Sequence, residues 1–110
     1  MKQHTAMITG ASRGIGAAIA KKFAAEGWNL VLTCLHSKEK LETQALELQA
    51  AYGITCFTFA GDMGSKRDVQ DCFRRIEERF EGVDVLINNA GISHAGLFTE
   101  LSLEDWEQVM

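Results

Sequence analysis

Three glycines near the N-terminus have the spacing of a loop that binds phosphate. Gly10, Gly14 and Gly16 follow a short apolar run, Thr5–Thr9, and lead into a segment with helical periodicity. A phosphate reaches the backbone only where side chains leave room, and a helix N-terminus offers unpaired N–H groups with partial positive charge. The spacing therefore predicts a site for the pyrophosphate of a dinucleotide. The alternative is a glycine-rich turn without a ligand.

Two later segments carry polar residues at the ends of apolar runs. Asp62 comes after the run Thr55–Ala60, and Asn88-Asn89-Ala90-Gly91 ends the run that begins at Val83. Taken alone, Asp62 is typical of a solvated turn. The side chain of Asn88 is expected to bond backbone groups and to hold neighbouring strands together rather than to touch a ligand.

The elements that would position these residues alternate between strands and helices. The expected strands are Thr5–Thr9, Leu30–Cys34, Thr55–Ala60 and Val83–Asn88. The strand at Leu30–Cys34 is apolar on both faces, which is typical of a parallel sheet covered by helices on each side. Right-handed strand–helix–strand units then predict an α/β fold, a Rossmann-type doubly wound parallel sheet with strand order 3-2-1-4. Residues 1–110 are expected to form a single domain without a linker.

Each intervening helix has an expected apolar stripe and an expected end. The stripes are Ile15, Ile19 and Phe23; Leu41, Ala45 and Leu48; and Val69, Phe73, Ile76 and Phe80, with Cys72 alongside. Glycines are expected to end these helices, at Gly27, Gly53 and Gly82. Capping boxes are expected at Ser65 with Asp68 and at Ser102 with Asp105.

Composition restricts the possible partners. The net charge of −4 argues against nucleic acid, which requires a basic surface. The longest apolar run is three residues, Val85–Ile87, which is too short to span a membrane. Met1 leads directly into the first strand without a signal peptide, so a cytoplasmic protein is expected. The three cysteines have no CxxC spacing and are expected to be reduced, small apolar residues, and no metal site is expected.

The glycine loop and the second motif together resemble the short-chain dehydrogenase/reductase family, including its 3-oxoacyl-carrier-protein reductase-like members. The loop Thr9-Gly10-Ala11-Ser12-Arg13-Gly14-Ile15-Gly16 matches the family pattern T-G-x-x-x-G-x-G in full. The family's N-N-A-G signature stands at residues 88–91, after the fourth expected strand. The resemblance covers essentially the whole chain and is specific for the family, though not for a substrate.

The resemblance assigns residues to a bound cofactor. Asp62 would accept a hydrogen bond from the adenine amino group, and Met63 would offer its backbone N–H to the ring. The other contacts would surround the phosphates and ribose or line the nicotinamide side: Gly10, Ser12, Arg13, Ile15 and Gly16, then Asn89, Ala90 and Gly91.

The end of the second strand favours NADP(H) over NAD(H). NAD enzymes usually place an acid there for the ribose 2′-hydroxyl, whereas this strand continues Leu35-His36-Ser37-Lys38 without a carboxylate. Arg13 is a family position associated with NADP and is always charged. His36 stands where many relatives place an arginine, although it could equally be a surface loop histidine.

The residues that would catalyse the family's reaction are not found in this sequence. The resemblance implies a serine, a Tyr-x-x-x-Lys pair and an upstream asparagine, whereas the single tyrosine, Tyr52, is followed four residues later by Cys56. We expect the chain to be the N-terminal half of a reductase, truncated before the remaining strands. The parent would transfer hydride between NADP(H) and a carbonyl or alcohol substrate, and the chain alone would be inactive.

Two other functions stay open at this stage. The chain could be a non-catalytic dinucleotide-binding module, or a self-associating structural module. The fourth strand, Val83–Asn88, would have no neighbour on one side in a truncated sheet. Because unpaired strand edges recruit other strands, we expect a homo-oligomer, such as a dimer, formed through this exposed edge or through adjoining helices.

Overall fold

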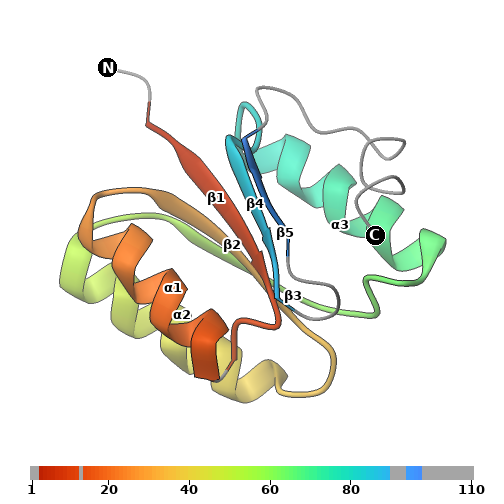
Figure 1. The fold of residues 1–110 in the computed structure, drawn as a ribbon, viewed down its shortest axis with the longest axis horizontal. Coiled ribbons are helices and arrows are strands. Elements are labelled where there is room, and N and C mark those ends of the chain that lie inside the picture. The colour runs from red at the N-terminus through yellow and green to blue at the C-terminus, as the bar shows by residue number, and fades with distance from the viewer. Residues whose placement is uncertain (1–2, 13, 90–93, 98–110) are drawn as a thin grey trace.

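The computed structural model describes residues 3–12, 14–89 and 94–97, and within them alternating strands and helices (Figure 1). The elements in chain order are β1 (Thr5–Thr9), α1 (Gly14–Ala25), β2 (Asn29–Cys34), α2 (Lys38–Tyr52), β3 (Cys56–Ala60), α3 (Lys66–Arg79), β4 (Val85–Asn88) and β5 (His94–Leu97). Each predicted strand is present within two residues of its expected bounds. The expected helix at Ser102 lies outside the described residues.

The strands form one sheet in the order β3-β2-β1-β4-β5. The first four are parallel, with Ala6 opposite both Leu30 of β2 and Val85 of β4. Helices α1 and α2 cover one face of the sheet and α3 covers the other (Figure 1). The predicted Rossmann-type doubly wound arrangement, with strand order 3-2-1-4, is therefore confirmed.

The prediction of an exposed fourth-strand edge is wrong. β5 pairs antiparallel with β4, and Val85 stands opposite Leu97 while Asn88 stands opposite His94. The backbone groups on that side of β4 are therefore engaged within the chain, so β4 does not offer a free edge to a second copy. A strand as short as β5 carries little periodicity, and the sequence did not reveal it. Association through the helices stays a prediction.

The predicted stripe of α1 is also wrong in part. Ile15 is 70% exposed, whereas Gly16, Ala20 and Ala24 form the buried face of the helix. Ile19 and Phe23 are partly buried at the side of this face. Small residues allow the helix axis to approach the sheet closely. The large apolar residues of the predicted stripe therefore lie beside the contact with the sheet and not at its centre.

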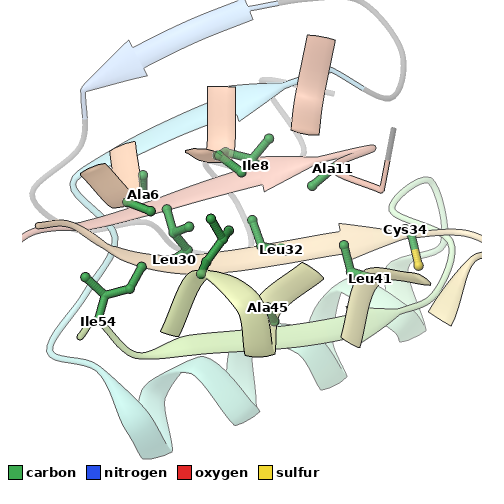
Figure 2. Packing of buried hydrophobic residues seen from close by; sticks show 12 residues of the cluster. Ala6, Ile8, Ala11, Leu30, Leu32, Cys34, Leu41, Ala45 and Ile54 are labelled. Carbon is green, nitrogen blue, oxygen red and sulfur yellow. The ribbon is translucent and has the colours of Figure 1, made fainter. Parts of the chain in front are cut away.

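The core has two parts, one on each side of the sheet. Figure 2 shows the part between the sheet and helices α1 and α2, where Leu30 and Leu32 of β2 meet Leu41 and Ala45 of α2. The part beneath α3 contains the predicted stripe of that helix, Val69, Cys72, Phe73 and Ile76, with Phe80 partly buried at its end. Both faces of β2 are buried, as its sequence predicts.

The helix ends follow local chemistry. Gly53 ends α2 with a left-handed φ of 68°, and its N–H donates to the Gln49 carbonyl. Gly27, after α1, also has a positive φ of 86°. α3 ends earlier than expected, at Arg79, with an extended Phe80 as its cap rather than Gly82. Among the helices that the structure describes, none has the length and apolar character that crossing a membrane would require.

Candidate functional site

The carboxyl ends of the four parallel strands meet along one edge of the sheet. We call the described segments that follow them the carboxyl-end rim: residues 10–12, 14–16, 35–37, 61–65 and Asn89. Backbone hydrogen bonds join two of these segments to the end of β2. Ala11 N–H donates to the Thr33 carbonyl at 3.0 Å, and Gly61 N–H donates to the Cys34 carbonyl at 2.9 Å. Ligands of open parallel sheets bind at this edge.

The glycine loop brings the start of α1 against the end of β1. Gly10 and Gly14 have φ angles of 62° and 60°, at which a residue with a side chain would be conformationally strained. A Cβ on Gly16 would overlap the Gly10 carbonyl oxygen and lie 2.8 Å from Asn89 Nδ2. A Cβ on Gly14 would meet no atom of the described residues within 4 Å. The loop is therefore tightly packed on its inner side and open on its outer side.

A hydrogen-bonded latch joins the ends of β1 and β4. The buried Thr9 hydroxyl donates to Asn88 Oδ1 at 3.0 Å and accepts the Asn89 N–H at 2.9 Å. Asn89 Nδ2 in turn donates to the Gly10 carbonyl at 3.3 Å. Asn88 is 1% exposed, so its side chain lies in the sheet interior and not on the open surface. The latch joins β1 to β4, and the expected bonds of the Asn88 side chain to backbone groups stay a prediction.

Asp62 lies in an exposed turn after β3. Its Oδ1 accepts the Gly64 N–H at 2.8 Å, and its carbonyl accepts the Ser65 N–H at 2.9 Å. The side chain of Met63, only 6% exposed, packs into the core beneath α3. Met63 can therefore contact a ligand at the rim only through its backbone.

The segment after β2 is exposed and has no carboxylate before α2. Leu35 and His36 are exposed, and Ser37 is half-buried at the start of the helix. The next acidic residues along the chain are Glu39 and Glu42, both on α2 itself, and Glu42 lies 3.8 Å from the Lys38 ammonium. An incoming phosphate would therefore meet no negative side chain of this segment before the helix begins.

The cysteine at the end of β2 has a raised pKa. Burial raises the pKa of the Cys34 thiol at the end of β2, and a backbone hydrogen bond from Ser37 offsets this only in part. Cys34 therefore stays a neutral thiol near pH 7. Tyr52 lies at the end of α2, next to the start of β3, which is the opposite edge of the sheet from the rim. The tyrosine of this chain thus cannot reach a ligand bound at the rim.

The structure places most of the predicted site residues along the rim. Gly10, Ser12, Ile15 and Gly16 lie in the glycine loop, His36 follows β2, Asp62 and Met63 follow β3, and Asn89 follows β4. Arg13, Ala90 and Gly91 lie outside the described residues. Ser12 is buried and Ile15 is exposed. Their contacts with a cofactor stay predictions.

The sequence did not predict the contacts of two residues that border the rim. Thr9 belongs to the glycine-loop motif, and its hydroxyl is also the centre of the latch. Asp68 was assigned to a capping box, but its carboxylate accepts the Asp62 N–H at 2.8 Å. The signal for Thr9 was its place directly before Gly10. No spacing rule would have connected Asp68 to Asp62.

The residues present fit the phosphates of a dinucleotide. The first turn of α1 carries no acidic residue, so the partial positive charge of its N-terminus is not neutralised there. The open space outside Gly14 and the exposed backbone of the loop provide an approach for an anion. Polar groups at the exits of β3 and β4 lie on either side, where the two halves of an extended ligand would rest.

Comparisons with known proteins support this assignment. A model of the short chain dehydrogenase family matches residues 4–110. A 3-oxoacyl-(acyl-carrier-protein) reductase from Staphylococcus epidermidis is 35% identical over 106 residues, which cover 96% of this chain and 43% of that protein. This chain therefore spans less than half the length of the curated relatives it matches.

Solved structures of related enzymes have a similar fold. L-sorbose reductase from Gluconobacter frateurii, complexed with NADPH and L-sorbose, is 33% identical with a TM-score of 0.76 and is matched over 96% of this chain and 40% of its own. An alcohol dehydrogenase from the archaeon Thermococcus sibiricus, complexed with 5-hydroxy-NADP, is 37% identical with a TM-score of 0.76. There the match covers 97% of this chain and 45% of that one.

Proposed function

This chain belongs to the short-chain dehydrogenase family, and we propose that it is the dinucleotide-binding part of an NAD(P)-dependent oxidoreductase. The observation that carries the proposal is the contact of Gly16 with Gly10, which seats the N-terminus of α1 directly behind the end of β1. A dinucleotide would lie along the carboxyl-end rim, with its pyrophosphate at this helix N-terminus.

We infer the orientation of the ligand from the order of the strands. β1 stands between β2 and β4, and β3 lies beyond β2. With the pyrophosphate at the end of β1, one half of the dinucleotide runs over β2 toward Asp62 and the other runs toward Asn89. In the family assignment the adenine takes the Asp62 side, where the backbone of Met63 faces the ring, and the nicotinamide takes the Asn89 side.

We propose that NADP(H) is bound in preference to NAD(H). A 2′-phosphate on the adenosine ribose would rest near the exit of β2, where the chain carries His36, Ser37 and Lys38 and no carboxylate. Arg13, outside the described residues, is the second candidate contact. The bound NADPH and 5-hydroxy-NADP of the two related structures support the same preference.

The bound dinucleotide would supply hydride transfer to or from a carbonyl or alcohol carbon. This chain's residues would bind and orient it: the α1 N-terminus holds the phosphates, and the latch of Thr9, Asn88 and Asn89 keeps the exits of β1 and β4 together. Tyr52, the chain's single tyrosine, is at the opposite edge of the sheet and cannot act there as an acid or base. We therefore expect the 110-residue chain to bind cofactor without turning over substrate.

Titration with NADPH and NADH, followed by calorimetry, tests the proposal. We expect NADPH to bind at least about tenfold more tightly, a difference of about 1.4 kcal/mol. His36→Asp should reverse the preference, because a carboxylate accepts the ribose hydroxyl and repels the phosphate. Thr43→Asp is the matched control, since it adds the same charge on an exposed position of α2 away from the rim. Absence of binding to either dinucleotide would refute the proposed site.

A further inference from the structure

Asp68 makes an unexpected contact at the start of α3. It is the third residue of the helix, and Ser65 is the N-cap residue, so the sequence predicts a reciprocal capping box. Ser65 Oγ does accept the Asp68 N–H, at a long 3.4 Å. The Asp68 carboxylate, however, accepts the N–H of Asp62 at 2.8 Å. The shorter bond therefore leads out of the helix into the turn that carries Asp62.

The contact completes a set of hydrogen bonds around Asp62. Its N–H is held by Asp68, its carbonyl by Ser65 N–H, and its Oδ1 by Gly64 N–H at 2.8 Å. Asp62 is exposed, and its Oδ2 makes no hydrogen bond with the residues that the structure describes. The backbone of Asp62 is thus held from both sides while one carboxylate oxygen stays open to a ligand.

Close packing before the turn brings Asp68 within reach. A Cβ on Gly61 would lie 2.5 Å from the Phe59 ring and 3.3 Å from Asp68 Oδ2. Phe59 is buried in the core beneath α3, so its ring has little room to move aside. Any side chain at this position would push the turn away from the helix. Gly61 therefore serves the same contact, by leaving space for the carboxylate.

We propose that Asp68 is a positioning residue that holds the Asp62 turn in the conformation that recognises the adenine amino group. The inference rests on the proposed function, because it needs an adenine at the rim. Asp68 itself does not touch the ligand. It acts through the Asp62 N–H, which sets where the open Asp62 oxygen and the Met63 backbone lie.

A purely structural role makes a different prediction. A carboxylate in the first turn of a helix interacts favourably with the helix dipole, so Asp68 could serve only to stabilise α3. Loss of helix stability would weaken the binding of every ligand to the same extent. Loss of the turn geometry would weaken the binding of a ligand that carries the amino group more than that of a ligand without it. The readout is therefore a ratio of affinities, which separates the two roles.

Nicotinamide hypoxanthine dinucleotide phosphate in its reduced form provides the second ligand. It carries an oxygen where adenine carries the amino group, and its N1 bears a hydrogen, so it lacks both the amino donor and the ring-nitrogen acceptor that adenine would present to the Asp62 turn. Calorimetry with both ligands gives the preference of the wild-type chain for adenine. We expect a preference of about tenfold, the value of a hydrogen bond to a charged acceptor.

Three variants decide the matter. Asp68→Ala should reduce the preference to about twofold or less, whereas Asp68→Asn keeps an acceptor oxygen in place and should retain most of it. Asp71→Ala removes a carboxylate of α3 that faces Arg74 and Arg75, away from the turn, and should leave the ratio unchanged. Amide exchange of Asp62, measured without ligand, should be faster in Asp68→Ala and near wild type in Asp68→Asn.

The outcomes distinguish the inference from the function on which it rests. If the wild-type chain binds neither ligand, both the proposed function and the inference fail. If it binds NADPH but Asp68→Ala keeps the wild-type ratio and the wild-type exchange rate, the inference alone fails. If Asp68→Ala does not fold, Asp68→Ser removes the contact with less disturbance of the helix start, and the same ratio and exchange rate decide.

Discussion

Replacing Thr9 by Val is the sharpest perturbation of the site, because it removes one hydroxyl and keeps the side-chain shape. Thr9 is fully buried, and its Oγ1 serves two partners, Asn88 Oδ1 at 3.0 Å and the Asn89 N–H at 2.9 Å. In Thr9→Val both partners lose this contact. Asn88 is buried with it, whereas Asn89 lies partly open to water.

The expected loss follows from these two environments. A buried polar group deprived of its partner costs about 1–3 kcal/mol, and a group that water can reach costs less. We therefore expect the free energy of unfolding to fall by about 2–4 kcal/mol in Thr9→Val. A domain of this size is typically stable by about 5–15 kcal/mol, so the loss is a substantial fraction. With a urea m-value of about 2 kcal/mol/M, the unfolding midpoint should fall by about 1–2 M.

Thr33 of β2 supplies a matched control. It is 1% exposed, and its hydroxyl takes no part in the latch. Thr33→Val should therefore lower the midpoint less than Thr9→Val does. Urea unfolding followed by circular dichroism measures both variants. If Thr9→Val unfolds at the same urea concentration as Thr33→Val, the latch does not stabilise the fold and the reasoning is wrong.

Three further predictions test the packing, the thiols and a helix end. Gly16→Ala should destabilise the chain by about 1–3 kcal/mol and weaken NADPH binding, because its Cβ would overlap the Gly10 carbonyl; equal affinity in calorimetry would contradict this. Burial raises the pKa of Cys56 to about 11 and that of Cys72 to about 12, from 9.0. The two buried neutral thiols therefore contribute fully to the free energy of unfolding below pH 9, and this contribution is lost as the pH rises through 11 and 12. The urea midpoint should fall across this range, and it should fall less steeply in Cys72→Ala. Gly53→Ala should cost about 1 kcal/mol at the left-handed end of α2, and Gly53→Asn should cost less; equal losses by urea unfolding would count against a conformational cause.

Much of the fold could be predicted from local patterns. Runs such as Leu30–Cys34, apolar on both faces, identify buried parallel strands, and the stripe of Leu41, Ala45 and Leu48 identifies the inner face of α2. These signals depend on residues close together in the chain. Where the contact surface is made by small residues, as at Ala20 and Ala24 of α1, periodicity misled, because large apolar residues lay on the flank instead.

The short strand β5 shows another limit of local patterns. The four residues of β5 pair antiparallel with β4, but their sequence has no turn signal or alternation strong enough to predict a strand. Their pairing is decided by the neighbouring strand, which offers an unused row of backbone donors and acceptors. The four strands were predicted correctly, but the prediction of association through a free β4 edge was wrong because the pairing of β4 with β5 depends on tertiary structure.

The sequence by itself determined the family, the strand order and the edge at which we propose that a ligand binds. Glycine spacing and the alternation of strands with helices carry this information, because both depend on the backbone geometry of residues that are close together in the chain. Only the tertiary structure decided which side chains cooperate at that edge. Thr9 meets Asn88 across 79 positions of the chain, and Asp68 reaches back to Asp62 from the next helix. Such contacts depend on where whole elements pack, and no local pattern encodes them.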